Sequence, residues 1–287
     1  MIPPVRKDES FLADVKRAAE EPDTLHIWWL GQSGFLVHRN QYFLLLDPYL
    51  SESLTNKYAR TDKPHVRMTE RVVAPEALNF IHVVTSSHNH TDHLDAETLI
   101  PLREVNPALQ MIIPEANREF VAERLKTDPG WPLGSDDGTT LELWDFTITG
   151  VASAHEALER DEAGRCKYLG YVVRIGPWTL YHSGDTVLYE GMAEKLRPFG
   201  IDVALLPING ARPERRVAGN LNGRESALLA KTMGAKLVVP CHYEMFEFNT
   251  ASTDEFVEEA SRIGQSYRLL RAGERLDLRP DGSVGVR

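Results

Sequence analysis

Cysteine is scarce in this chain, since only Cys166 and Cys241 occur among 287 residues and they lie far apart. Two such residues provide no disulfide framework and are typical of a reducing compartment. The chain also lacks any apolar run near the roughly 20 residues that cross a bilayer. Its first 21 residues contain no apolar block of the kind that a secretory signal needs. We therefore predict a cytoplasmic protein with no membrane segment.

Positive charge is also in short supply, because 32 Lys and Arg residues face 42 Asp and Glu residues, a net charge of −10. Nucleic-acid binding needs clustered cations that neutralise phosphates, so no nucleic-acid partner is expected. A local group of arginines or a bound metal ion can still attract a small anion against this overall charge. The predicted partner is therefore a small-molecule, anionic substrate, while the oligomeric state, including a homo-oligomer, stays open.

Apolar residues at 42% and charged residues at 26% are typical of a globular protein with a large core. Short runs rich in β-branched and aromatic residues predict strands at 25–30, 35–38, 42–47, 80–87, 110–113, 141–153 (one bent strand or two), 168–176, 178–184, 202–208, 236–241 and 267–273. Helices are predicted at 8–20, 95–103, 115–125, 190–198, 223–233 and 253–263, and a long loop at 49–71. This order predicts one α/β domain, residues 1–287, with layers in the order helix, sheet, sheet, helix.

The densest group of metal-binding side chains is His88-Asn89-His90-Thr91-Asp92-His93, with four potential ligands in six residues. Imidazole and carboxylate bind zinc, manganese and iron. The run follows an apolar strand, so we expect it at the sheet edge where α/β proteins place their active sites. Alternate residues of an extended segment point the same way, so His88 and His90 can share one ion, while Asp92 and His93 face a second position. A solvated polar loop is the alternative interpretation.

Three more candidate ligands stand at the ends of other predicted strands. His155 follows ITGVASA, Asp185 follows WTLYHSG, and His242 comes directly after KLVVPC. Strand ends are where segments far apart in the sequence converge on one edge. Each residue taken alone is compatible with a hydrogen-bonded structural role, but together with the dense cluster we predict all three to be metal ligands.

The order of HNHTDH, a later His, an Asp within SGD and a final His after a strand resembles the metallo-β-lactamase superfamily. Within it, WWLGQSGFLV (28–37), YHSGDT (181–186) and AKLVVPCH (235–242) look like the L-ascorbate-6-phosphate lactonase-like branch. The segment VPCHYEMFEFN is closer to related metal-dependent hydrolases. The resemblance implies a metallo-β-lactamase fold, which is a four-layer αββα sandwich, and the activity of a binuclear metallohydrolase.

Carried over to this sequence, the family pattern implies two divalent ions. One ion would take His88, His90 and His155; the other would take Asp92, His93 and His242, and Asp185 would bridge them. Such ions share a hydroxide formed near neutral pH, which attacks the substrate. Asp92 would be the catalytic residue that orients the hydroxide and accepts its proton. Zinc is the general expectation, the lactonase resemblance implies manganese, and iron is possible.

Three residues beside the candidate ligands have less specific patterns. Asp47 closes the strand 42–47 and either steers a ligand or caps the turn before Pro48. His182 precedes SGD and is interpreted as structural or as a neighbour of the ligands. Cys241 is expected to face the core, since it alternates with His242.

Basic residues in two loops suggest how an anionic substrate is bound, because Arg forms paired hydrogen bonds with carboxylate and phosphate. The loops are 57–71 and 209–216, although charged loops are often merely solvated. Aromatic residues after His242, including Phe246 and Phe248, are compatible with either a pocket lining or core packing. The predicted substrate-binding residues are Arg60, Arg67, Asn209, Arg212, Arg216 and Tyr243.

The leading functional hypothesis is hydrolysis of a small anionic ester or lactone, such as a sugar-phosphate lactone. One alternative is a phosphodiesterase that acts on a nucleotide, RNA or a phospholipid, and another is a non-catalytic metal-binding protein. Oxygen reduction is disfavoured, because di-iron members of the family carry a carboxylate where this chain has His90.

Overall fold

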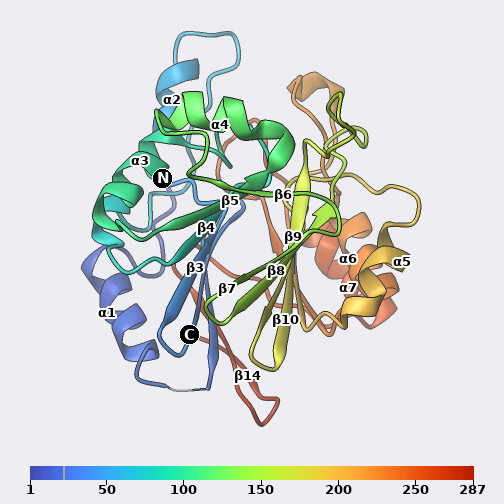
Figure 1. Cartoon of the computed structure of the whole chain (residues 1–287). Helices are drawn as coiled ribbons and strands as arrows, with labels where there is room; N and C mark the ends of the chain where they lie inside the picture. Colours follow the sequence, from blue (N-terminus) through green and yellow to red (C-terminus); the bar gives the residue numbers. More distant parts are fainter. Residues whose placement is uncertain (22) are drawn as a thin grey trace.

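The computed structural model describes residues 1–21 and 23–287 and contains two mixed β-sheets that pack face to face (Figure 1). The first sheet has the order β14-β13-β1-β2-β3-β4-β5-β6. Its strands are β1 Leu25–Gly31, β2 Gly34–Arg39, β3 Tyr42–Leu46, β4 Val83–Thr85, β5 Gln110–Pro114, β6 Leu133–Ser135, β13 Arg275–Leu278 and β14 Val284–Val286. The second sheet has the order β12-β11-β10-β9-β8-β7. Its strands are β7 Thr140–Leu143, β8 Phe146–Ala152, β9 Leu169–Ile175, β10 Trp178–His182, β11 Val203–Pro207 and β12 Leu237–Cys241.

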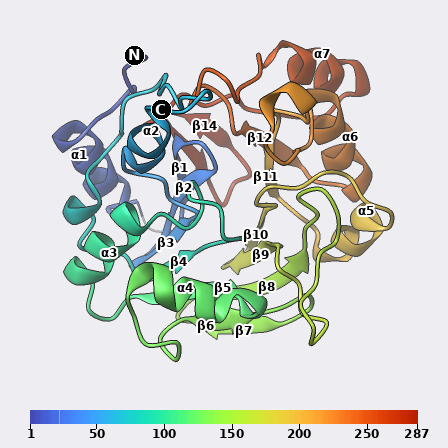
Figure 2. The ribbon, with the colours of Figure 1, turned by 90° about the horizontal axis from the view of Figure 1, so that it is seen from above.

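Helices cover the outer face of each sheet (Figures 1 and 2). The first sheet is covered by α1 Glu9–Ala18, α3 Ala96–Val105 and α4 Arg118–Leu125. The second is covered by α5 Met192–Leu196, α6 Gly223–Met233 and α7 Asp254–Ile263. The short helix α2 Ser53–Tyr58 lies at one end of the sandwich, and single 3₁₀ turns occur at Pro75–Ala77, Glu115–Asn117, Arg197–Phe199 and Pro213–Arg215. The predicted four-layer order, helix, sheet, sheet, helix, is confirmed.

Successive side chains along each strand point to opposite faces of the sheet and so pack into two separate parts of the core. In β2, Phe35 and Val37 pack between the sheets, whereas Leu36 packs under the helices of the first sheet. The neighbouring strands β1 and β3 alternate in the same way, and both faces of this central part of the first sheet are therefore buried. Strands buried on both faces need nearly continuous apolar runs, which explains the composition of LHIWWL and YFLLL.

The structure corrects part of the predicted secondary structure. The strand predicted at 267–273 is wrong: Tyr267 forms only an isolated bridge with Val238, a turn follows, and the strand begins at Arg275. Leu270 and Ala272 are apolar because they pack against the core, not because they lie in a strand. The segment 49–71 contains α2 within its long loop, and 141–153 is two strands.

Strand direction gathers the candidate ligands at one end of the molecule. In the first sheet, β3, β4 and β5 are parallel, and in the second, β10, β11 and β12 are parallel. β8 runs antiparallel to β9, which runs antiparallel to β10, so β8 also points to the same end. None of the helices within residues 1–21 and 23–287 has the length and apolar character that a membrane crossing requires.

Candidate metal centre

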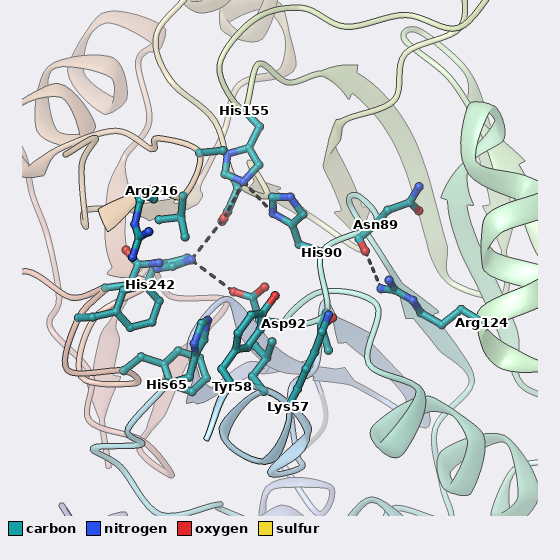
Figure 3. A pocket seen from close by; sticks show the side chains of 18 residues that line it. Lys57, Tyr58, His65, Asn89, His90, Asp92, Arg124, His155, Arg216 and His242 are labelled. Carbon is teal, nitrogen blue, oxygen red and sulfur yellow. Dashed lines mark hydrogen bonds and ion pairs between the residues drawn. The ribbon is translucent and has the colours of Figure 1, made fainter. Parts of the chain in front are cut away.

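Two groups of His and Asp side chains meet at this end of the sandwich, beneath a pocket (Figure 3). In the first, the histidine group, the ligand atoms lie within 4.8 Å of one another; its members are His88, His90 and His155. In the second, the mixed group, the ligand atoms also lie within 4.8 Å of one another; its members are Asp92, His93, Asp185 and His242. The structure thus brings every candidate ligand into one of two compact groups.

The ends of four strands deliver these side chains. The loop after β4 carries HNHTDH, and His155, Asp185 and His242 follow β8, β10 and β12 within three residues. Gly184 allows two of these loops to approach each other, because a Cβ at this position would lie 2.6 Å from the Cβ of Ser87. Its φ of +58° is also a conformation that favours glycine. A side chain at position 184 would therefore push the Asp185 loop away from the β4 loop.

Asp185 lies between the two groups. Its Oδ2 is 3.6 Å from His155 Nε2 and 3.3 Å from His242 Nε2, and its Oδ1 is 3.3 Å from His93 Nε2. The side chain is only 4% exposed, so water does little to screen its charge. One carboxylate therefore contacts members of both groups, which is the position that a ligand shared by two ions would occupy.

Burial and neighbouring charges set the ionisation of the ligands. Burial, together with the adjacent histidines, lowers the pKa of His88 well below its usual value and that of His90 to about 4. Burial also acts to lower the pKa of His93, but the nearby carboxylates outweigh it and raise this pKa well above its usual value. Burial acts to raise the pKa of Asp185, but His242 and His93 outweigh it and hold this pKa well below its usual range. His88, His90 and Asp185 thus have the free lone pairs that metal binding needs, whereas His93 must first lose a proton.

The unpartnered atoms of the site fit a divalent cation. His88 Nε2, His93 Nε2 and Asp185 Oδ1 are buried, and no hydrogen bond reaches them from residues 1–21 and 23–287. Buried polar atoms without partners are rare in native proteins and need an explanation. Imidazole nitrogens and carboxylate oxygens directed at a common point are a donor set for zinc, manganese or iron.

Asp47 holds one of the ligands in place. Its Oδ2 accepts a hydrogen bond from His93 Nδ1 at 2.8 Å, and its Oδ1 accepts one from Thr85 Oγ1 at 2.8 Å. The carboxylate is fully buried and also accepts the Ser87 amide. With the proton on Nδ1, the free nitrogen of His93 is Nε2, which faces the mixed group. Of the two roles considered for Asp47, steering a ligand is the one that its contacts support.

His182 and Cys241 do not take part in the ligand groups. His182 Nε2 donates a hydrogen bond to the Ser33 carbonyl at 2.9 Å. Cys241 is buried in the core, as its alternation with His242 predicts.

Gln32 is a site residue that sequence reasoning missed. It lies in the turn between β1 and β2 with a φ of +50° and is fully buried. Its side-chain Nε2 donates to Asp92 Oδ2 at 2.8 Å and lies 3.0 Å from His242 Nε2. The two flanking glycines of GQSG signal a tight turn, but nothing in the sequence indicates that this turn reaches the ligands.

A cavity of about 370 Å³ opens onto both groups. This volume lies within the range of about 300–1,000 Å³ that is usual for small-molecule sites. Beside the ligands it is lined by basic and aromatic side chains from four segments: Lys57, Tyr58, His65, Arg124, Arg216, Phe246 and Phe248. Lys57, Tyr58 and His65 belong to the basic segment 57–71 that the sequence indicated, although they were not among the predicted contacts. Arg124 on α4 lacked a sequence signal, because its position is that of an ordinary surface residue.

Of the predicted substrate-binding residues, only Arg216 lines the cavity. Arg60 and Arg212 are exposed elsewhere. The other three are buried and form hydrogen bonds within the fold: Arg67 donates to the Ser51 and Thr69 carbonyls, Asn209 donates to Asn249, and the Tyr243 hydroxyl donates to the Leu270 carbonyl. These five residues lie outside the pocket because the loops fold back onto the protein, which charge composition does not reveal.

Comparison with known families agrees with this geometry. The family model described as "Beta-lactamase superfamily domain" matches residues 42–243, a stretch that includes every candidate ligand. This chain belongs to the metallo-β-lactamase superfamily. Among its relatives is a UPF0173 metal-dependent hydrolase of Methanoculleus marisnigri, 30% identical over 206 residues, or 69% of this chain and 83% of the relative. Another, from Methanoregula boonei, is 29% identical over 260 residues, or 89% of this chain and 99% of the relative.

Membership of the UPF0173 metal-dependent hydrolases favours an enzyme over a non-catalytic metal-binding protein. Solved structures agree on the fold of this metallo-β-lactamase superfamily member. Igni18, a metallo hydrolase from Ignicoccus hospitalis, is 20% identical with a TM-score of 0.63, covering 92% of this chain and 98% of its own. The metallo-β-lactamase fold protein YhfI from Bacillus subtilis is 19% identical with a TM-score of 0.61, covering 92% and 100%.

Proposed function

We propose that this metal-dependent hydrolase cleaves a small ester or lactone that carries an anionic group, with two divalent ions held by the histidine group and the mixed group. The observation that carries the proposal is the position of Asp185, whose two carboxylate oxygens face ligands of both groups. We take residues 1–287 to form one catalytic domain and the cytoplasm to be its compartment, which the two unpaired cysteines support.

The ions would supply a nucleophile at neutral pH and a Lewis acid for the substrate oxygen. The protein's own contribution is orientation. Asp92 and Asp185 both line the cavity, and Asp92 is the more exposed of the two, with 16% of its side chain exposed against 4%. The Oδ2 of Asp92 lies 3.7 Å from both His93 Nε2 and His242 Nε2. Gln32 fixes this same oxygen by a hydrogen bond. Asp92 is therefore placed to orient an attacking water and to accept its proton.

Charge around the cavity supports an anionic substrate. Lys57, Arg124 and Arg216 all line it in a chain whose net charge is −10. Lys57 has no ion-pair partner within residues 1–21 and 23–287, and its ammonium lies 5.1 Å from the ring centroid of Tyr58. A sugar-phosphate lactone, which the lactonase-like motifs suggest, fits this charge, and a phosphodiester is the competing substrate class.

The test combines metal analysis with substrate screening. We expect about two ions per chain, and turnover of lactones and carboxylic esters above that of phosphodiesters. Asp185→Asn and His88→Ala should reduce kcat/KM by at least about a hundredfold, as removal of transition-state stabilising groups does. His82→Ala is the matched control, because His82 is a half-buried histidine that precedes β4 at the opposite end of that strand.

Three outcomes would contradict the proposal in whole or in part. Protein that binds no metal after reconstitution, or activity that survives both substitutions, would remove the two-ion mechanism. Preferred cleavage of phosphodiesters would keep the mechanism and replace the substrate class.

A further inference from the structure

One wall of the cavity is aromatic. Tyr58 and His65 stack with ring centroids 4.1 Å apart and planes 16° from parallel. Phe248 lies 4.4 Å from the same His65 ring, and Phe246 lies 5.4 Å from it. In Figure 3, Tyr58 and His65 lie across the pocket from His155. We call Tyr58, His65, Phe246 and Phe248 the aromatic wall.

Backbone pairing holds the aromatic wall in place without a ligand. The Glu247 amide donates to the Val66 carbonyl at 3.0 Å, and the Met68 amide donates to the Met245 carbonyl at 2.8 Å. The segment that follows His242 is thereby fixed to the segment that contains His65. A preformed wall loses little conformational entropy when a ligand binds to it.

Phe246 and Phe248 both contact the His65 ring from one tight turn. The turn is closed by a hydrogen bond from the Asn249 amide to the Phe246 carbonyl at 3.0 Å, and Glu247 between the two rings is exposed. Together with Tyr49, Leu54 and Met245, Phe246 forms a small apolar cluster that is separate from the two cores of the sandwich. The wall therefore adds nothing to the packing of the sheets.

Part of the aromatic wall is open to the cavity, although Tyr58 and His65 cover one face of each other's ring. Tyr58, His65 and Phe248 are only half-buried and line the cavity. Burial lowers the pKa of His65 below its usual value, so its ring is uncharged near neutral pH. The cavity thus has ligand groups on one side and flat, uncharged rings on the other.

We propose that the aromatic wall binds a flat aromatic group in the non-reacting part of the substrate, an inference that rests on the hydrolase function proposed above. Aromatic rings attract one another in stacked or edge-to-face geometry beyond their burial of apolar surface. A ring held here leaves its ester or lactone beside Asp92, and Lys57 at the edge of the wall meets an acidic substituent. The substrate class is therefore an aromatic ester or lactone with an anionic substituent.

The test compares benzoate with cyclohexanecarboxylate as ligands of the zinc-loaded protein, by titration calorimetry. Both molecules have one carboxylate on a six-membered ring and can contact the ions in the same way. Benzoate is the less basic carboxylate, so tighter binding of benzoate would come from its flat aromatic ring and not from the ions. We expect benzoate to bind about fivefold more tightly, the factor that a ring–ring contact provides.

Variants identify the wall as the source of this preference. Phe248→Leu and Tyr58→Leu should each reduce the affinity for benzoate towards that for cyclohexanecarboxylate, which itself should change little. Trp144→Leu is the control, because Trp144 is an exposed aromatic residue in the turn between β7 and β8, outside the cavity. It should keep the full preference.

Equal affinities in the unsubstituted protein, or a benzoate preference that survives in both wall variants, would overturn the inference. Failure of the hydrolase function would look different. A protein that keeps the benzoate preference but cleaves no ester retains the aromatic subsite, whereas one that cleaves esters without this preference retains only the hydrolase function.

Discussion

His93 shows how contacts at one ring nitrogen prepare the other for a metal ion. Asp47 accepts the Nδ1 proton at 2.8 Å, while Nε2 lies among the carboxylates of the mixed group. Those carboxylates also raise the pKa of His93, so a metal ion must displace a proton to bind there. The buried carboxylates that attract the metal ion therefore also make its binding dependent on pH. The apparent affinity of the protein for the metal ion should rise with pH.

Replacing Asp47 by Asn should weaken metal binding without removing a ligand. The amide cannot match the negative charge that fixes the His93 tautomer, and loss of such a partner weakens metal affinity by about 10- to 100-fold. A competition titration of zinc against a chelator measures this change. Asp14→Asn is the matched control, because Asp14 is also a buried carboxylate, bonded to Trp28 Nε1 at 2.9 Å outside the site. Equal affinities in the Asp47 variant and the unsubstituted protein would exclude this role.

The sequence located the ligands better than the substrate pocket, and the reason is geometric. HNHTDH is dense, and His155, Asp185 and His242 mark strand ends, which parallel strands bring together. Gln32 reaches the same site through a backbone turn with positive φ, and no residue pattern encodes that reach. In the same way, the identity of the residues that line the pocket depends on the path that the long loops take, which the sequence does not indicate.

At the scale of elements, two loops meet across the mouth of the cavity. Arg216 Nη2 lies 2.6 Å from Asp62 Oδ2, and Lys63 Nζ donates to the Glu214 carbonyl. We call residues 59–65 and 212–218 the mouth loops. Arg216 also lines the cavity. Its contact with Asp62 therefore both joins the two loops at the cavity entrance and partly neutralises a positive charge beside the site.

Asp62→Asn should loosen the mouth loops and leave the fold intact. Both partners are exposed, so the ion pair is weak and screened by salt. We expect faster amide hydrogen exchange in 212–218 and a KM that changes by about twofold or less at low salt. The difference should vanish at high salt, and kcat should stay the same. Glu70→Gln, which removes the exposed pair with Lys7, is the control, and unchanged exchange in 212–218 would show that the pair does not tie the loops together.

Local sequence patterns predicted helices and strands correctly where the packing of the folded protein favours the same structure. The helix predicted at 223–233 matches α6 at both ends: Asn222 and Glu225 form a capping box at its start, and Gly234 with a φ of +82° follows its end. The strand predicted at 267–273 fails because Leu270 and Ala272 are buried by a turn, which produces the same apolar composition as a strand. Tertiary contacts, and not intrinsic strand propensity, decide whether such a short segment forms a strand.

At the scale of the whole molecule, both ends of the sandwich contain buried histidines, but within residues 1–21 and 23–287 the grouped candidate metal ligands all lie at one end. At the other end, His26 Nδ1 contacts Asp277 Oδ1 at 2.7 Å, and its ring stacks on His38 with centroids 5.6 Å apart. Burial lowers the pKa of His38 to about 4, although its hydrogen bond with the Asn40 carbonyl at 2.7 Å opposes this. Metal binding cannot explain this histidine, which is retained as a neutral, packed ring.

This depressed pKa makes the stability of the fold dependent on pH. Between the unfolded value of about 6.5 and the folded value of about 4, the unfolded chain binds the proton and the folded one does not. The free energy of unfolding therefore falls as the pH drops through this window, by about 2 kcal/mol between pH 7 and pH 5 for His38 alone. At pH 5 the carboxyl groups remain largely ionised, which leaves histidines as the main cause. Chemical denaturation of the protein and of His38→Gln at fixed free zinc isolates this contribution, since the metal centre at the opposite end adds the same loss to both. A variant that loses as much stability as the unsubstituted protein would show that His38 is not the group that titrates.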